Sequence, residues 1–140
     1  MKTVRFWFPL LAGLMIMCAG CGGPHYKVCQ IEGTLLYDGT PVPETDINFT
    51  PSNNDRGATG HTDAQGRFKV RYTRDVDGIP PGEYKVSLSV EPTYENDATK
   101  VRDELPDFKK LLERYSSETT PLTLNITKPD KEMKLEVSLQ

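Results

Sequence analysis

Strict alternation of apolar and polar side chains over residues 62–90 is the feature that most constrains this sequence. The stretch around Phe68 and the stretch around Val86 both follow it, and a Gly/Pro loop, DGIPPG, separates the two. A period of two places successive side chains on opposite faces of a β-strand. We therefore expect two strands, each with one wet face and one core face as in an antiparallel sheet, the core faces carrying Phe68, Val70, Tyr72, Tyr84, Val86, Leu88 and Val90.

The same alternation recurs in five other segments, which are residues 27–37, 45–50, 58–63, 121–127 and 132–140. Turn dipeptides such as Asp38-Gly39 and Gln65-Gly66 lie between strands, and turns recur at a spacing of roughly ten residues. This spacing is typical of an all-β sandwich. The prediction is an all-β fold of seven antiparallel strands.

Residues 91–118 interrupt the alternation. Within them the apolar residues Leu105, Phe108, Leu111, Leu112 and Tyr115 recur at helical spacing, which predicts one short amphipathic helix over about residues 106–115. Pro106 in its first turn suits a helix start.

Two interpretations of this long segment stay open. A long insertion in a small domain is often a binding element, and the side chains that would form an acidic, aromatic partner-binding surface are Tyr94, Glu95, Asp97, Asp103 and Glu104. Alternatively, its apolar residues close one open end of the sandwich.

The N-terminus has the order of an export signal. Two basic residues, Lys2 and Arg5, precede an apolar run over residues 6–17, and small residues precede Cys21. The run is shorter than the roughly 20 apolar residues that span a bilayer. An ordinary cleaved signal and an uncleaved anchor are the alternatives to a lipid attachment signal.

The sequence Cys18-Ala19-Gly20-Cys21 resembles the lipobox of bacterial lipoproteins, although Cys18 stands where that family usually has Leu. The resemblance implies a signal peptide over residues 1–20, a lipidated Cys21, a tether over residues 21–26 and a folded domain over residues 27–140. Gly22 is not the Asp that retains lipoproteins at the inner membrane. The expected location is the cell envelope, at the outer membrane or surface rather than the inner membrane.

Loss of residues 1–20 would remove two of the 17 basic residues and none of the 20 acidic ones, which leaves a net charge of −5. An acidic chain argues against binding to nucleic acid and against electrostatic docking to anionic lipid. Only Cys29 would then remain as a free thiol in the domain, so no internal disulfide is expected. Its phase with Ile31 and Leu35 places Cys29 on the core face.

Three segments together are similar to the carboxypeptidase regulatory-like domains: residues 33–42 (GTLLYDGTPV), 62–68 (TDAQGRF) and 81–86 (PGEYKV). The resemblance covers about residues 28–90. It implies a seven-stranded Greek-key sandwich of the transthyretin (prealbumin-like) type. Such motifs set turns and core positions and do not by themselves specify an activity.

Some transthyretin-like proteins are hydroxyisourate hydrolases that use His and Arg residues. That activity would need a pocket joining His61 to Arg67 or Arg71. A carbohydrate-binding module, the other alternative, would need exposed coplanar aromatic rings, for which only Tyr26 and Tyr94 lie off the expected core faces.

We expect a lipid-anchored cell-envelope sandwich that acts as a binding or structural module, with no catalytic residues. No residue spacing suggests a metal site or a cofactor. The expected partners are the membrane, through the N-terminal lipid, and an envelope protein or glycan.

Overall fold

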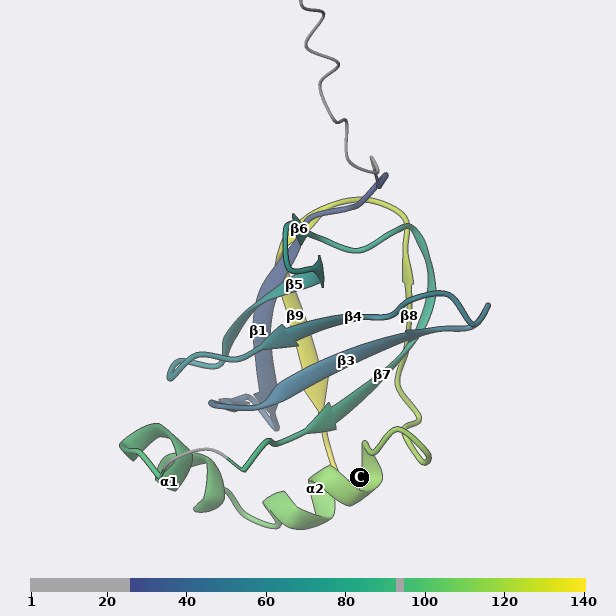
Figure 1. Ribbon diagram of the computed structural model, residues 1–140. Coiled ribbons are helices and arrows are strands. Elements are labelled where there is room, and N and C mark those ends of the chain that lie inside the picture. Colours follow the sequence, from purple (N-terminus) through teal and green to yellow (C-terminus); the bar gives the residue numbers. More distant parts are fainter. Residues whose placement is uncertain (1–25, 93–94) are drawn as a thin grey trace, which may run out of the picture.

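The computed structural model describes residues 26–92 and 95–140 (Figure 1). Their elements, in chain order, are β1 (Ile31–Tyr37), β2 (Thr40–Pro41), β3 (Asp46–Pro51), β4 (Ala58–His61), β5 (Arg67–Thr73), β6 (Val76–Asp77), β7 (Gly82–Ser89), α1 (Asp97–Asp103), α2 (Phe108–Arg114), β8 (Thr123–Ile126) and β9 (Asp130–Val137). The fold is β-rich, as the alternation predicts. Each of the seven longer strands coincides largely with a predicted segment, although β3 ends one residue after its segment and β9 begins two residues before its own. The two-residue strands β2 and β6 were not predicted.

The strands form a curled sheet with the order β2-β1-β5-β4-β3-β7-β8. Strand β5 changes partners along its length, because Phe68 pairs with Gly33 of β1 whereas Val70 pairs with Gly60 of β4. A strand shared in this way allows two groups of strands to enclose a common core. Figure 1 shows β1 and β9 on one side of that core and β3 and β7 on the other.

One pairing corrects the expectation that all strands are antiparallel. Strand β9 pairs with β1 in parallel, from Gly33 opposite Met133 to Tyr37 opposite Val137. The register shifts between Ile31 and Gly33, and a Cβ atom built on Gly33 would lie 2.1 Å from the carbonyl oxygen of Met133. The parallel pairing therefore depends on the missing side chain of Gly33.

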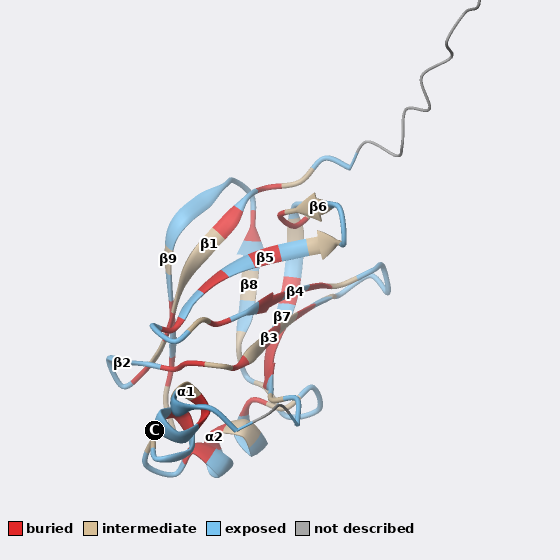
Figure 2. Ribbon diagram, turned by 60° about the vertical axis from the view of Figure 1, so that its left-hand side comes forward, coloured by how far each residue is buried: buried red, intermediate tan, exposed pale blue. Residues whose placement is uncertain are grey.

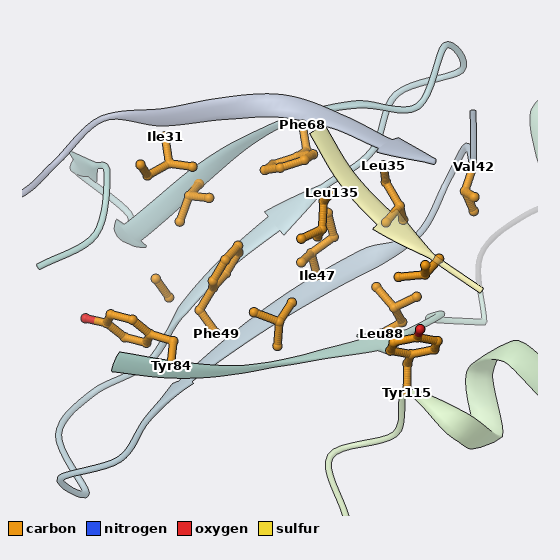
Figure 3. Close-up of a cluster of buried hydrophobic side chains, with 14 of the residues drawn as sticks. Ile31, Leu35, Val42, Ile47, Phe49, Phe68, Tyr84, Leu88, Tyr115 and Leu135 are labelled. Atoms are coloured by element: carbon orange, nitrogen blue, oxygen red, sulfur yellow. The ribbon is translucent and has the colours of Figure 1, made fainter. Parts of the chain in front are cut away.

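The core faces are largely those predicted from the alternation. Buried and exposed residues alternate along β5 and the first half of β7 (Figure 2), and the inward side chains meet in one cluster (Figure 3). Cys29 is buried and unpaired, as expected. Two of the expected core residues, Tyr72 and Val90, are only half-buried at the edge of this cluster.

The segment after β7 forms two helices instead of the single predicted one. In α1, Asn96 is the N-cap, and its side chain accepts a hydrogen bond from the main-chain N–H of Thr99 at 2.9 Å. The buried face of α1 consists of Thr99 and Arg102, so it has no apolar period to detect. The second helix, α2, begins at Phe108, later than predicted, because Asp107 has a left-handed conformation with φ of 54°.

The helices lie at the end of the sheet opposite the end where the described chain begins (Figure 1). Phe108 and Leu111 are buried in the core, and Leu105 and Leu112 pack against it half-buried. This confirms that the apolar residues of the insertion cover one end of the core. Burial of each large side chain contributes about 1.5–3 kcal/mol to folding.

Candidate functional site

A cavity of about 370 Å³ lies at the end of the domain away from the helices. Its walls come from the segment before β1, the β3–β4 loop, the end of β5 and the start of β7. We call it the tyrosine pocket, and the residues that define it are Tyr26, Asn53, Asp55, Arg56, Tyr72 and Tyr84.

Two aromatic rings meet in the tyrosine pocket. The centroids of Tyr26 and Tyr72 are 5.0 Å apart and their planes are inclined by 72°, which is an edge-to-face contact. The ring of Tyr84 is buried, and its hydroxyl donates a hydrogen bond to the carbonyl oxygen of Pro80 at 2.8 Å. Burial, followed by the proximity of Tyr72 and Asp55, raises the pKa of Tyr84, so this phenol stays neutral.

Polar side chains of the β3–β4 loop are held in place around the same cavity. The Nε of Arg56 donates to the carbonyl oxygen of Tyr72 at 3.1 Å. The amide of Asn53 donates to Asp55 Oδ2 at 2.6 Å, and the main-chain N–H of Asp55 donates back to Asn53 Oδ1 at 3.2 Å. These hydrogen bonds hold a guanidinium, an amide and a carboxylate beside the cavity.

A second cavity, of about 330 Å³, brings His61 together with Lys69 and Arg71 on the outer face of β3, β4 and β5. Arg67 does not join it, since it lines a different cavity and pairs with Asp63 at 3.0 Å. The placement that a hydrolase would need is therefore met for Arg71 and not for Arg67.

His61 contacts a carboxylate on each side of its ring. Nδ1 lies 2.7 Å from Asp46 Oδ1, and Nε2 lies 3.3 Å from Glu44 Oε2. Burial lowers the pKa of His61, but the hydrogen bonds to both carboxylates and their negative charges outweigh burial and raise the pKa above 6.5. The His61 side chain is 52% exposed, so it lies on the surface, and its carboxylate partners were not predicted.

The basic groups beside His61 also have partners. Asp77 Oδ2 lies 2.7 Å from Lys69 Nζ, and Asp77 Oδ1 lies 3.4 Å from Arg71 Nε. The hydrogen bond between Lys69 and Asp77 raises the pKa of Lys69 and lowers the pKa of Asp77. This cavity is therefore a network of satisfied ion pairs rather than a set of free reactive groups.

The proposed acidic surface of the insertion is exposed. Glu95, Asp97, Asp103 and Glu104 all lie in or next to α1 and face solvent, while Tyr94 falls outside the described residues. Asp97 is 3.9 Å from Lys100, and Asp103 is 2.8 Å from Arg102. Partner binding at this surface stays a prediction.

Arg102 is a buried charged residue that the sequence analysis did not single out. Its side chain is 9% exposed, its Nη1 donates to the carbonyl oxygen of Glu44 at 2.8 Å, and its guanidinium lies 5.7 Å from the ring centroid of Phe108. It thereby attaches α1 to the segment before β3. An isolated Arg among charged residues gives no sequence signal of burial.

The tyrosine pocket was missed for a different reason. Tyr72 was expected on the core face, but it is half-buried near the end of β5 and contacts Tyr26. The polar run PSNNDRG, residues 51–57, has the composition of a loop and shows no binding pattern of its own. The only hint in the sequence was Arg56 within that run, because the second strand after it carries Tyr72.

Cys21 lies outside the described residues. Within residues 26–92 and 95–140, no helix has the length and apolar character to cross a bilayer. The same two ranges hold no group of three or more His, Cys, Asp and Glu side chains arranged to bind a metal ion.

The fold and the pocket define a predominantly antiparallel β domain with a ligand-sized cavity at one end. No protein-family model, curated protein or solved structure matches the chain.

Proposed function

We propose that the chain is a lipid-anchored domain of the cell envelope that acts as a binding or structural module and catalyses no reaction of its own. The tyrosine pocket carries this proposal, because its aromatic and polar groups are fixed in place without forming a nucleophile–base pair. Two groups of strands that share β5 fit a Greek-key sandwich of the transthyretin type, which we propose as the finer description of the fold.

The position of the pocket fits an anchored protein. Tyr26 lines the cavity, and only four residues separate it from Cys21 in the sequence. A lipidated Cys21 would hold the pocket close to a membrane surface, since each residue of a tether spans at most about 3.6 Å. The ligand of the module is then a component of the envelope near that surface.

The state of His61 supports a module without catalysis. A general base needs a free ring nitrogen within reach of a substrate proton. Both ring nitrogens of His61 contact carboxylates, and the raised pKa favours the protonated form.

Site-specific photocrosslinking in the intact cell tests the binding function. A diazirine amino acid replaces Ser52, an exposed residue at the rim of the tyrosine pocket, in the full lipidated chain. We expect an ultraviolet-dependent adduct that disappears when Tyr26→Ala is added. The same amino acid at Lys134, exposed on β9, is the matched control. Identical adducts at both positions, or none at position 52, would contradict the proposal.

A hydrolase of the transthyretin-like kind is the second candidate, because one cavity joins His61 to Arg71. Incubation of the purified chain with hydroxyisourate decides between the two. We expect the same rate of decay as in buffer. Faster decay that His61→Gln abolishes would establish the hydrolase instead.

A further inference from the structure

We propose that the tyrosine pocket binds a neutral saccharide of one or two sugar rings. This inference rests on the proposed binding function and names the ligand class of that function. A sugar ring has an apolar C–H face and an edge of neighbouring hydroxyl groups, so its site needs an aromatic wall beside planar hydrogen-bonding groups.

Tyr26 and Tyr72 supply the aromatic wall. Tyr26 is 44% exposed and therefore accessible, and its plane is inclined by 72° to that of Tyr72. The two rings are therefore not the coplanar pair expected of a carbohydrate-binding module, and they form an aromatic corner in which one ring stacks on the sugar face. A tyrosine presents a large apolar surface with a polar tip and few rotatable bonds, which limits the entropy lost on binding. The buried Tyr84, whose hydroxyl donates to the carbonyl oxygen of Pro80, also lines the pocket.

Arg56 and Asp55 supply the hydrogen-bonding wall. Arg56 uses Nε to contact the Tyr72 carbonyl, and its two terminal nitrogens make no hydrogen bond to another residue of the described ranges. Asp55 uses Oδ2 with Asn53, and its Oδ1 has no partner within those ranges. A guanidinium fork and a carboxylate match pairs of adjacent hydroxyl groups, which act as both donors and acceptors.

The charge of the pocket points to a neutral ligand. Two basic residues, Lys27 and Arg56, line it together with two acidic residues, Asp55 and Glu83. This balance gives no net attraction for an anion or a cation, and complementary charge is what would select either. An aromatic cage for a quaternary ammonium group is the competing occupant, and its formal charge makes it distinguishable.

The volume is consistent with a short ligand. The cavity of about 370 Å³ lies at the lower end of the roughly 300–1,000 Å³ range of small-molecule sites. It suits one or two rings of a longer glycan, with the remainder passing over the exposed rim residues Ser52 and Asn53.

Calorimetric titration of the full lipidated chain in detergent tests the assignment. The neutral probes are cellotriose, maltotriose and tri-N-acetylchitotriose, and the charged probes are trigalacturonate, the glucosamine trimer and tetramethylammonium. We expect at least one neutral trisaccharide to bind more tightly than every charged probe. Tyr26→Ala should weaken its binding by about three- to tenfold through loss of the aromatic contact. Arg56→Gln should weaken it by roughly tenfold or more.

Val101→Ala is the matched control, because Val101 is an exposed apolar residue on α1, at the opposite end of the domain, and this variant should bind like the parent. The assignment is wrong if no neutral probe binds at about 10 mM, if a charged probe binds best, or if the pocket variants keep full affinity. If the saccharide assignment fails but the adduct at position 52 still depends on Tyr26, the proposed binding function stands. If that adduct is absent as well, both the saccharide assignment and the binding function are wrong.

Discussion

The phenolic oxygen of Tyr115 forms two hydrogen bonds with the main chain of Ser138, accepting from its N–H and donating to its carbonyl oxygen, each at 3.1 Å. The carbonyl oxygen of Tyr115 in turn accepts from the N–H of Leu88 at 2.7 Å. One residue thus joins the end of α2 to β7 and to the segment after β9. Tyr115 therefore holds together the end of the core that the helices cover. The sequence pattern predicted only that Tyr115 lies on the apolar face of a helix.

Tyr115→Phe removes the hydroxyl and leaves both polar groups of Ser138 without their partner. We expect a loss of about 1–3 kcal/mol in the free energy of unfolding, since unsatisfied half-buried groups carry a desolvation cost. Urea denaturation measures it. Tyr26→Phe is the control, because Tyr26 is exposed, and it should unfold like the parent. Equal stability of Tyr115→Phe would show that water replaces the phenol without cost.

Gly33→Ala should disrupt the parallel pairing of β1 with β9. Its Cβ would lie 2.1 Å from the Met133 carbonyl oxygen, so the main chain of β9 must move. We expect a loss of about 1–3 kcal/mol or more and faster amide hydrogen exchange in β9. Gly60→Ala is the matched control within a strand, because its nearest atom lies at 3.3 Å and a smaller loss is expected. Similar exchange in both variants would contradict the role of Gly33.

The period of two was sufficient to locate the seven long strands, because burial of one face is a local property of each strand. Strand pairing is not local. The parallel partner of β9 depends on the close approach of Gly33 to Met133 across the fold, and no pattern within either strand encodes it. The buried face of α1 escaped prediction because Thr99 and Arg102 are polar.

The candidate site was less predictable than the fold. Its polar groups come from a loop between β3 and β4, and its aromatic groups come from the segment before β1 and from the end of β5. Only the tertiary fold brings Arg56 to the carbonyl of Tyr72, 16 residues away. The carboxylates around His61 likewise come from the segment before β3 and the start of β3, rather than from its own strand.

His61 should make the stability of the domain depend on pH. Because Asp46 and Glu44 raise its folded pKa, the stabilisation is fully present below about 6.5, the unfolded pKa, and is lost as pH rises through the folded value. NMR titration of the imidazole should give a pKa above 6.5. The urea midpoint should fall between these two pKa values, and His61→Gln should flatten that fall. Because the side chain is half exposed, salt should weaken the effect.

Asp46→Asn is the companion variant, and it should lower the His61 pKa without changing the fold. Glu44 would then be the carboxylate that still raises the pKa of His61. A His61 pKa below 6.5 in the parent chain would contradict the ion-pair assignment.

Arg102→Met should loosen α1 from the domain. The substitution removes the charged hydrogen bond to the Glu44 carbonyl, at 2.8 Å, and the contact over the Phe108 ring. We expect a loss of roughly 1.5–3 kcal/mol, which is typical of a hydrogen bond from a charged group. Hydrogen exchange should accelerate in α1. Lys100→Met, at an exposed position of the same helix, is the control and should leave exchange unchanged. Equal acceleration of exchange in both variants would show that the lost positive charge on α1, and not the contacts of Arg102, causes the effect.

Cys21→Ser tests the membrane anchor, and the pocket gives this variant a second readout. Without lipid attachment the chain should move from the membrane pellet to the soluble fraction, because a lipid anchor is the only membrane contact that we propose and the acidic chain is not attracted to anionic lipid. The folded domain should be unaffected, so Cys21→Ser should keep the urea midpoint of the parent. It should also lose the adduct at position 52 if the ligand lies at the membrane surface.

Cys29→Ser, which alters a buried thiol, is the matched control and should stay in the pellet. Unchanged membrane association of Cys21→Ser would refute the lipid attachment.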